Sequence, residues 1–145
     1  MRAHRVFFDA SVIIAALLSP TGGSALLFQY VKLGKIIGIT SQTAIIEVLE
    51  EDKSKKIKRP KEEIEQFIAQ SGLIVRESIT VEEIAIYHNR IDVEDAHLIA
   101  RAKLTKCLLL VTLDKKHLLK EDIRKRFLPL KIVSPKELLE EILSK

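Results

Sequence analysis

Carboxylates accompany two of the most apolar segments of the chain. Asp9 lies inside the stretch HRVFFDASVIIAALL at residues 4–18, and Asp114 follows the segment KCLLLVTL at residues 106–113. A charge desolvated alone among such side chains costs on the order of ~3 kcal/mol or more, so Asp9 needs a partner or contact with solvent. If both segments form strands of one parallel sheet, the two carboxylates lie along the same edge, where open α/β sheets bind ligands.

Three further acids can reach that edge. Glu47 lies within AIIEVLE, in a predicted helix where we expect it to face partly inward, and Asp92 and Asp95 share one face at the start of another predicted helix. Carboxylates crowded at one edge repel each other unless a cation holds them. Because the ligands are oxygens without a cluster of Cys or His, the pattern favours Mg²⁺ or Mn²⁺ over Zn²⁺.

Each acid also has a purely structural interpretation. Asp92 can cap its helix, and Asp114 can cap the segment that follows it. Glu47 can be a partly exposed helix residue whose aliphatic stem packs against its neighbours. Asp9 is the hardest to explain in this way. The prediction of a metal site therefore depends on the whole set and not on any single member.

Strand and helix patterns alternate along the chain. Apolar runs bounded by turn residues predict strands at residues 5–8, 35–40, 73–77, 106–113 and 130–134. Apolar residues at helical spacing, with Ser41 and Pro135 at helix starts, predict helices at residues 10–18, 24–33, 42–51, 61–71, 80–90, 92–104 and 135–145. We predict an α/β fold, a three-layer α/β/α sandwich with a mainly parallel central sheet.

Composition narrows the class of protein. With 145 residues, 47% of them hydrophobic, the chain can bury the core of one domain, and we expect a single domain over residues 1–145. Asp9 argues against a secretory signal, no apolar run approaches the roughly 20 residues of a membrane span, and the lone Cys107 cannot form an internal disulfide. We expect a cytoplasmic protein with no membrane contact. The net charge of +4 modestly favours a polyanionic partner.

Four segments, in this order and spacing, resemble the acidic motifs of the PIN domain family: FFDASVII, AIIEVLE, DVEDAHLIARA and LLLVTLDKKHL. The resemblance spans nearly the whole chain, and no single motif carries it. PIN domains are metal-dependent ribonucleases that include the toxins of many bacterial and archaeal toxin–antitoxin pairs. The resemblance implies an RNA substrate, Mg²⁺ or Mn²⁺ as cofactor, a homodimer and, for a toxin, an antitoxin protein as partner.

Carried over by position, the resemblance implies a quartet of catalytic, metal-binding acids: Asp9, Glu47, Asp95 and Asp114. It adds Asp92 as a fifth metal ligand, and Ser11 and Thr112 as supporting hydroxyls. The third motif departs from the family pattern, in which small residues follow the aspartate, because here His97 and Arg101 follow. Such acids permit hydrolysis of a phosphodiester by metal-activated water, without a protein nucleophile.

Basic side chains adjoin the predicted site in the sequence. Lys115 and Lys116 directly follow Asp114, and we expect them to contact RNA. A longer basic run at residues 53–61 is interpreted as a solvated connection between helices, because acidic residues flank it.

Three functions from different classes fit these observations. The first is a metal-dependent endoribonuclease, as in the toxin of a toxin–antitoxin pair. The second is a PIN-like RNA-binding module that has lost catalysis. Metal-dependent cleavage of RNA that is lost in Asp95→Asn would separate the first function from the second. The third, a receiver-type or phosphatase-type α/β protein, fits less well because Asp9 is followed by Ala10 and Ser11 and not by a second acid.

Overall fold

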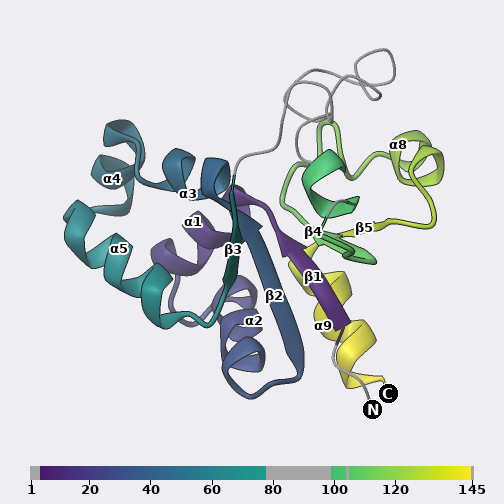
Figure 1. Ribbon diagram of the computed structural model, residues 1–145, viewed down its shortest axis with the longest axis horizontal. Coiled ribbons are helices and arrows are strands. Elements are labelled where there is room, and N and C mark those ends of the chain that lie inside the picture. Colours follow the sequence, from purple (N-terminus) through teal and green to yellow (C-terminus); the bar gives the residue numbers. More distant parts are fainter. Residues whose placement is uncertain (1–3, 78–98, 104, 145) are drawn as a thin grey trace.

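The computed structural model describes residues 4–77, 99–103 and 105–144 (Figure 1). The order of elements is β1 His4–Phe8, α1 Ala10–Leu18, α2 Gly23–Lys32, β2 Ile36–Ser41, α3 Gln42–Val48, α4 Glu51–Ile57, α5 Lys61–Gln70, β3 Ile74–Arg76, β4 Leu109–Val111, α8 Glu121–Arg126, β5 Lys131–Val133 and α9 Pro135–Leu143. Residues 99–103 are also helical, as predicted. The helix predicted at residues 80–90, and most of the one at 92–104, lie outside the described residues.

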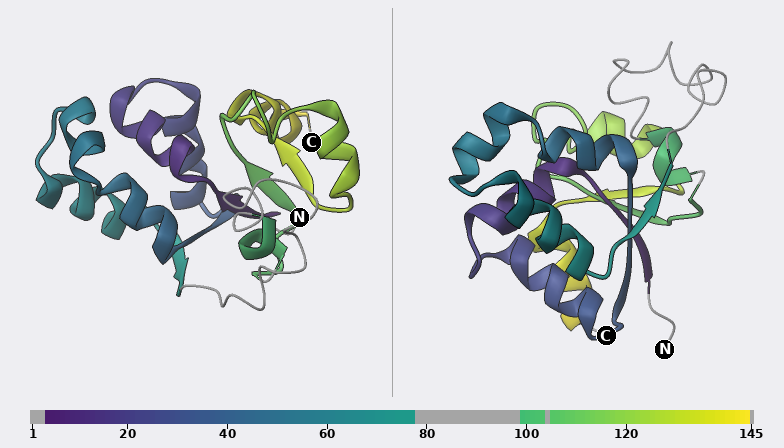
Figure 2. Two further views of the ribbon diagram at one scale, coloured as in Figure 1. Left: turned by 90° about the horizontal axis from the view of Figure 1, so that it is seen from above. Right: turned by 60° about the vertical axis from the view of Figure 1, so that its left-hand side comes forward.

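The strands form one sheet in the order β3-β2-β1-β4-β5, and every neighbouring pair is parallel. β1 lies at the centre, where Arg5 is in register with Ile37 of β2 and Phe7 with Leu110 of β4. Figure 2 shows helical segments on both sides of this sheet. The predicted α/β/α sandwich is confirmed, and its sheet is parallel throughout the described part of the chain.

Alternate residues of β1 pack into two separate hydrophobic cores. Val6 and Phe8 pack with apolar residues of α1, α2 and α9 on one face, whereas Phe7 packs on the opposite face with Ile99. This division follows from the two-residue period of a strand. On the first face the ring centroids of Phe8 and Phe28 lie 5.1 Å apart. A central strand that is covered on both faces reads as a continuous apolar run, which explains the segment before Asp9.

The strand predicted at residues 106–113 is shorter than expected and spans only Leu109–Val111. Lys106 adopts a left-handed φ of 60° in a turn, and Leu108 is 66% exposed. The apolar run therefore continues into a turn that hydrophobicity alone cannot distinguish from the strand.

The basic run at residues 53–61 is mostly helical, so its interpretation as a connection is wrong for α4. Lys53 and Lys55 of α4 pair with Asp52 at 3.6 Å and Glu51 at 3.4 Å. Acids in the first turn and lysines in the last turn suit the helix dipole. Only residues 58–60 connect α4 to α5.

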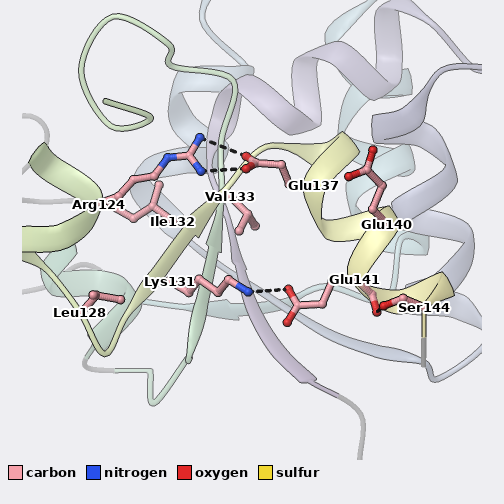
Figure 3. Close-up of a pocket in the computed structure, with 9 residues that line it drawn as sticks. All are labelled: Arg124, Leu128, Lys131, Ile132, Val133, Glu137, Glu140, Glu141 and Ser144. Carbon is pink, nitrogen blue, oxygen red and sulfur yellow. Dashed lines mark hydrogen bonds and ion pairs between the residues drawn. The ribbon is translucent and has the colours of Figure 1, made fainter. Parts of the chain in front are cut away.

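Helix α8 was not predicted from the sequence, and it is tied to α9. Arg124 donates to both carboxylate oxygens of Glu137, at 2.8 and 3.1 Å (Figure 3). The hydrogen bond from Arg124 is the largest cause that lowers the pKa of Glu137 to about 2. Ser134 and Glu137 also form a capping box, with Pro135 in the first turn of α9 as predicted.

Among the described residues, no single helix is long and apolar enough to cross a membrane. Helices α1 and α2 meet that test only as a pair, and the pair is bent by 104°. Most of the apolar side chains of both helices are buried in the first core.

Candidate active site

Two hydroxyl groups hold Asp9 just beyond the carboxyl end of β1. Its Oδ2 accepts hydrogen bonds from Ser11 Oγ at 2.8 Å and from Thr112 Oγ1 at 2.7 Å. No described residue donates a hydrogen bond to its other oxygen, Oδ1. One oxygen is therefore fixed by the protein, and the other is available to a cation or to a donor from outside.

Asp9 also occupies the N-cap position of α1, yet its side chain makes no capping hydrogen bond. Aspartate at this position ordinarily accepts a hydrogen bond from a backbone N–H of the first turn, which satisfies one of the free donors of the helix. Here the carboxylate is turned instead toward the hydroxyls of Ser11 and Thr112. Helix capping therefore does not account for the carboxylate at this position.

The same two hydroxyls join β1 to the segment after β4. Thr112 Oγ1 accepts a hydrogen bond from Asp114 N–H at 3.1 Å, and Ser11 Oγ accepts one from Leu113 N–H at 3.1 Å. Thr112 is fully buried. Since each hydroxyl accepts from this segment and donates to Asp9, the position of the carboxylate depends on the pairing of the adjacent strands β1 and β4 (Figure 1).

Asp114 caps the segment that follows it, as predicted. Its Oδ1 accepts a hydrogen bond from the backbone N–H of His117 at 3.2 Å, and His117 Nδ1 lies 3.4 Å from the same oxygen. Asp114 thus caps the turn after β4, while no described residue donates to its Oδ2. Lys115 and Lys116 are exposed in this turn. Because a carboxylate has two oxygens, capping leaves Asp114 able to bind a second group.

Arg101 is a buried cation beside these acids. It lies in the helical segment 99–103 and is only 5% exposed. Burial lowers the pKa of its guanidinium, whereas the charges of Glu47 and Asp9 raise it. Its Nε has no hydrogen-bond partner in the described part of the chain. From the sequence Arg101 was only a departure from a motif, although a lone charge inside the apolar run LIARA could have identified it.

Glu47 reaches the site along α3. The predicted N-cap Ser41 starts this helix, and its Oγ accepts a hydrogen bond from Ala44 N–H at 3.1 Å. Glu47 is exposed, so the expectation that it faces partly inward is wrong. Its charge nevertheless acts on the buried Arg101, as does that of Asp9. The structure therefore relates Asp9 to Asp114 through Thr112, and Asp9 to Glu47 through Arg101.

The predicted ligands Asp92 and Asp95 lie outside the described residues, as does His97. Within the described residues, no group of three or more His, Cys, Asp or Glu side chains is placed to hold a metal ion. The oxygens that are placed do suit a hard divalent cation, because Asp9 Oδ1 and Asp114 Oδ2 accept no hydrogen bond from this part of the chain. The complete set of ligands stays a prediction.

The comparison with known families agrees with this architecture. A family model described as a PIN domain matches residues 5–116, which is well over half of the chain and includes all four predicted acids. A search of curated proteins gave no match. The matched region contains four of the five parallel strands, an arrangement of the nuclease type. Family match, sheet topology and the order of the acidic motifs agree, and the chain belongs to the PIN domain family.

Proposed function

We propose that this protein is an endoribonuclease that depends on Mg²⁺ or Mn²⁺ and hydrolyses RNA phosphodiester bonds. The observation that carries this proposal is the arrangement of Asp9. Its carboxylate stands at the ligand-binding edge of a parallel sheet, makes no helix cap, and keeps one oxygen fixed by two hydroxyls and one oxygen available.

In this proposal the acids divide the work of holding metal. Asp9 and Asp95 are the principal ligands, Glu47 and Asp114 complete or anchor the set, and Asp92 is a fifth acid nearby in the sequence. A bound divalent cation supplies charge neutralisation at the phosphate and a water of lowered pKa.

The neighbouring side chains orient the acids and the substrate. Ser11 and Thr112 fix the orientation of Asp9, as hydrogen-bond partners of metal ligands commonly do. Arg101 offsets part of the negative charge when no substrate is present. Lys115 and Lys116 attract the phosphates that flank the cleaved bond. Replacing both lysines with Ala should lower the salt slope of RNA binding by about 1.4, at roughly 0.7 for each lost contact to a single strand.

Arg101 also favours a second candidate function, an RNA-binding PIN module without catalysis. A buried guanidinium can offset part of the negative charge of Asp9 and Glu47 without any metal, because arginine side chains stay protonated in proteins. The two candidates share the fold and the RNA surface. They differ in whether metal produces cleavage.

The cleavage experiment uses a labelled single-stranded RNA with Mg²⁺, Mn²⁺ or EDTA. We expect products with 5′-phosphate ends in either metal, and loss of activity in Asp9→Asn and Asp95→Asn. Asp52→Asn is the matched control, since this exposed acid of α4 pairs only with Lys53 at 3.6 Å in the described structure. Full activity in EDTA contradicts the proposal. Binding of RNA without cleavage in any metal supports the second candidate.

We further propose the role of toxin in a toxin–antitoxin pair, with an antitoxin protein and a second copy of the chain as partners. Expression in a bacterial host should then arrest growth, and Asp9→Asn should relieve the arrest. Sedimentation of the purified protein tests the homodimer. Equal growth with the parent and the variant contradicts the toxin role without affecting the proposed chemistry.

A further inference from the structure

An apolar groove adjoins the acids on the α2 and α9 side of the sheet. It has a volume of about 500 Å³, and its lining includes Leu113, Leu139 and Leu143 together with Lys115 and Lys136. This volume falls within the roughly 300–1,000 Å³ that is usual for sites of small organic groups. Leu113 and Lys115 lie on either side of Asp114 in the chain, and Leu113 N–H donates to Ser11 Oγ at 3.1 Å. The groove therefore begins one residue from the proposed active site.

The two lysines of this groove, Lys115 and Lys136, form no ion pairs within the described part of the chain. The pocket shown in Figure 3 differs, because its cations are already paired, Arg124 with Glu137 at 2.8 Å and Lys131 with Glu141 at 3.2 Å. The ammonium groups of this groove, unlike the cations of that pocket, are free to pair with an anionic group.

The side chain of Ser24 adds a second observation. Ser24 lines the groove and is 7% exposed, yet its Oγ forms no hydrogen bond with the described residues. It belongs to the first turn of α2, a helix of ten residues whose N-cap, Gly22, provides no side-chain cap. The hydroxyl of Ser24 is therefore free to bind a group in the groove, and an uncapped helix start presents free N–H groups to an anion. These donors lack the acceptor that a phosphate would supply.

We propose that this groove binds one nucleotide of the RNA strand, next to the phosphate at the acids. Its phosphate lies between Lys115, Lys136 and the start of α2, and its base packs on Leu113 and Leu143, which are 39% and 70% exposed. This inference rests on the proposed function, since it takes RNA as the substrate.

Glu140 restricts the orientation of the bound nucleotide. Glu140 also lines the groove. An ionised carboxylate only accepts hydrogen bonds, so it disfavours a second phosphate and favours a base edge that carries an amino group. The groove therefore combines two lysines that suit a phosphate with apolar side chains and one acceptor that suit a base.

The test measures binding of a fluorescein-labelled single-stranded oligoribonucleotide by anisotropy, in EDTA and at several salt concentrations, so that the result does not require cleavage. Lys136→Ala should weaken binding about fivefold at 0.1 M salt and lower the salt slope by about 0.7, the value of one lost phosphate contact. Leu143→Ser should weaken binding without changing the slope, because apolar contacts release no counterions. Lys136→Gln serves as a second neutral variant.

Lys56→Ala is the matched control, because this exposed lysine of α4 lies outside the groove and forms no ion pair with described residues. The proposed nucleotide site is refuted by any of three results: equal effects of Lys56→Ala and Lys136→Ala, an unchanged affinity in Leu143→Ser, or no RNA binding by the parent. If the expected binding pattern appears but the parent cleaves no RNA in Mg²⁺ or Mn²⁺, the groove stands and the endoribonuclease proposal fails.

Discussion

Thr112→Val removes one hydroxyl and keeps nearly the same side-chain volume at a fully buried position. The change deletes the 2.7 Å hydrogen bond to Asp9 and leaves the Asp114 N–H without its acceptor at 3.1 Å. A hydrogen bond to a charged group contributes about 1.5–3 kcal/mol. We therefore expect a loss of about 2 kcal/mol of unfolding free energy, which corresponds to a fall in Tm of about 4–8 °C for a chain of this size.

The same change should weaken metal binding, because Asp9 loses one of the two groups that orient it. Loss of a group that orients a metal ligand typically lowers the affinity for the metal by about 10–100-fold. At a free Mn²⁺ concentration of one hundred times the parent Kd, the parent gains about 2.7 kcal/mol. A variant with tenfold weaker binding gains about 1.4 kcal/mol under the same conditions. Melting curves with and without Mn²⁺ measure both effects.

Thr40→Val provides the matched control. Thr40 is equally buried, but its Oγ1 donates to the neutral carbonyl of Phe8 at 2.9 Å and forms no bond to Asp9. It should lose about 1 kcal/mol and keep the Mn²⁺ response of the parent. If Thr112→Val melts like Thr40→Val and responds to Mn²⁺ like the parent, the hydroxyl does not position Asp9 for metal, and the reasoning is refuted.

Three further predictions concern single charges. Arg101→Met should lower the Tm of the metal-free protein and raise its stabilisation by Mn²⁺ by about 1 kcal/mol, since the acids lose their internal cation; an unchanged response in melting curves would place Arg101 outside the site. The pKa of Glu137 is about 2, below its ordinary value of 4.5, so its pairing with Arg124 stabilises the fold above pH 4.5 and is lost as the pH falls toward 2. Because the Glu137 side chain is 41% exposed, solvent screening reduces this contribution to about 1 kcal/mol. In urea unfolding, the free energy of unfolding of Glu137→Gln should therefore fall by about 1 kcal/mol less than that of the parent between pH 4.5 and 2. Asp95→Asn should raise the Tm of the metal-free protein, by an amount worth about 1 kcal/mol, and should gain less from Mn²⁺ than the parent; a destabilised variant with the parent's Mn²⁺ response would identify Asp95 as a helix cap.

Local patterns were sufficient to predict many of the elements. The predicted cap at Ser41 accepts from Ala44, three residues further along the chain, and the predicted Pro135 stands in the first turn of α9. The strand before Asp9 is readable because a strand covered on both faces must be apolar along its whole length. Such features depend on the period of a helix or strand and on short-range hydrogen bonds, and both are determined by residues that are close in the sequence.

Features that depend on distant residues or on turn geometry were less accessible. The run at 106–113 is apolar throughout, but the left-handed Lys106 confines the strand to Leu109–Val111. Helix α8 lacks a long apolar face, since none of its residues is buried. Its Arg124 binds Glu137 of α9, and this contact forms only when the two helices pack together. Hydrophobic periodicity carries no signal for either case.

The candidate site shows the same division. The sequence determined that carboxylates follow apolar strand segments, and it predicted the acids and hydroxyls from the order of four motifs. Only the tertiary structure decided that Thr112 binds the same oxygen of Asp9 as Ser11, across 103 positions of the chain, and that Arg101 lies buried within the influence of two acids. The physical reason is that the parallel pairing of β1 with β4 and the packing of the helical segment 99–103 on the sheet create these contacts, and neither is encoded in the spacing of any one segment.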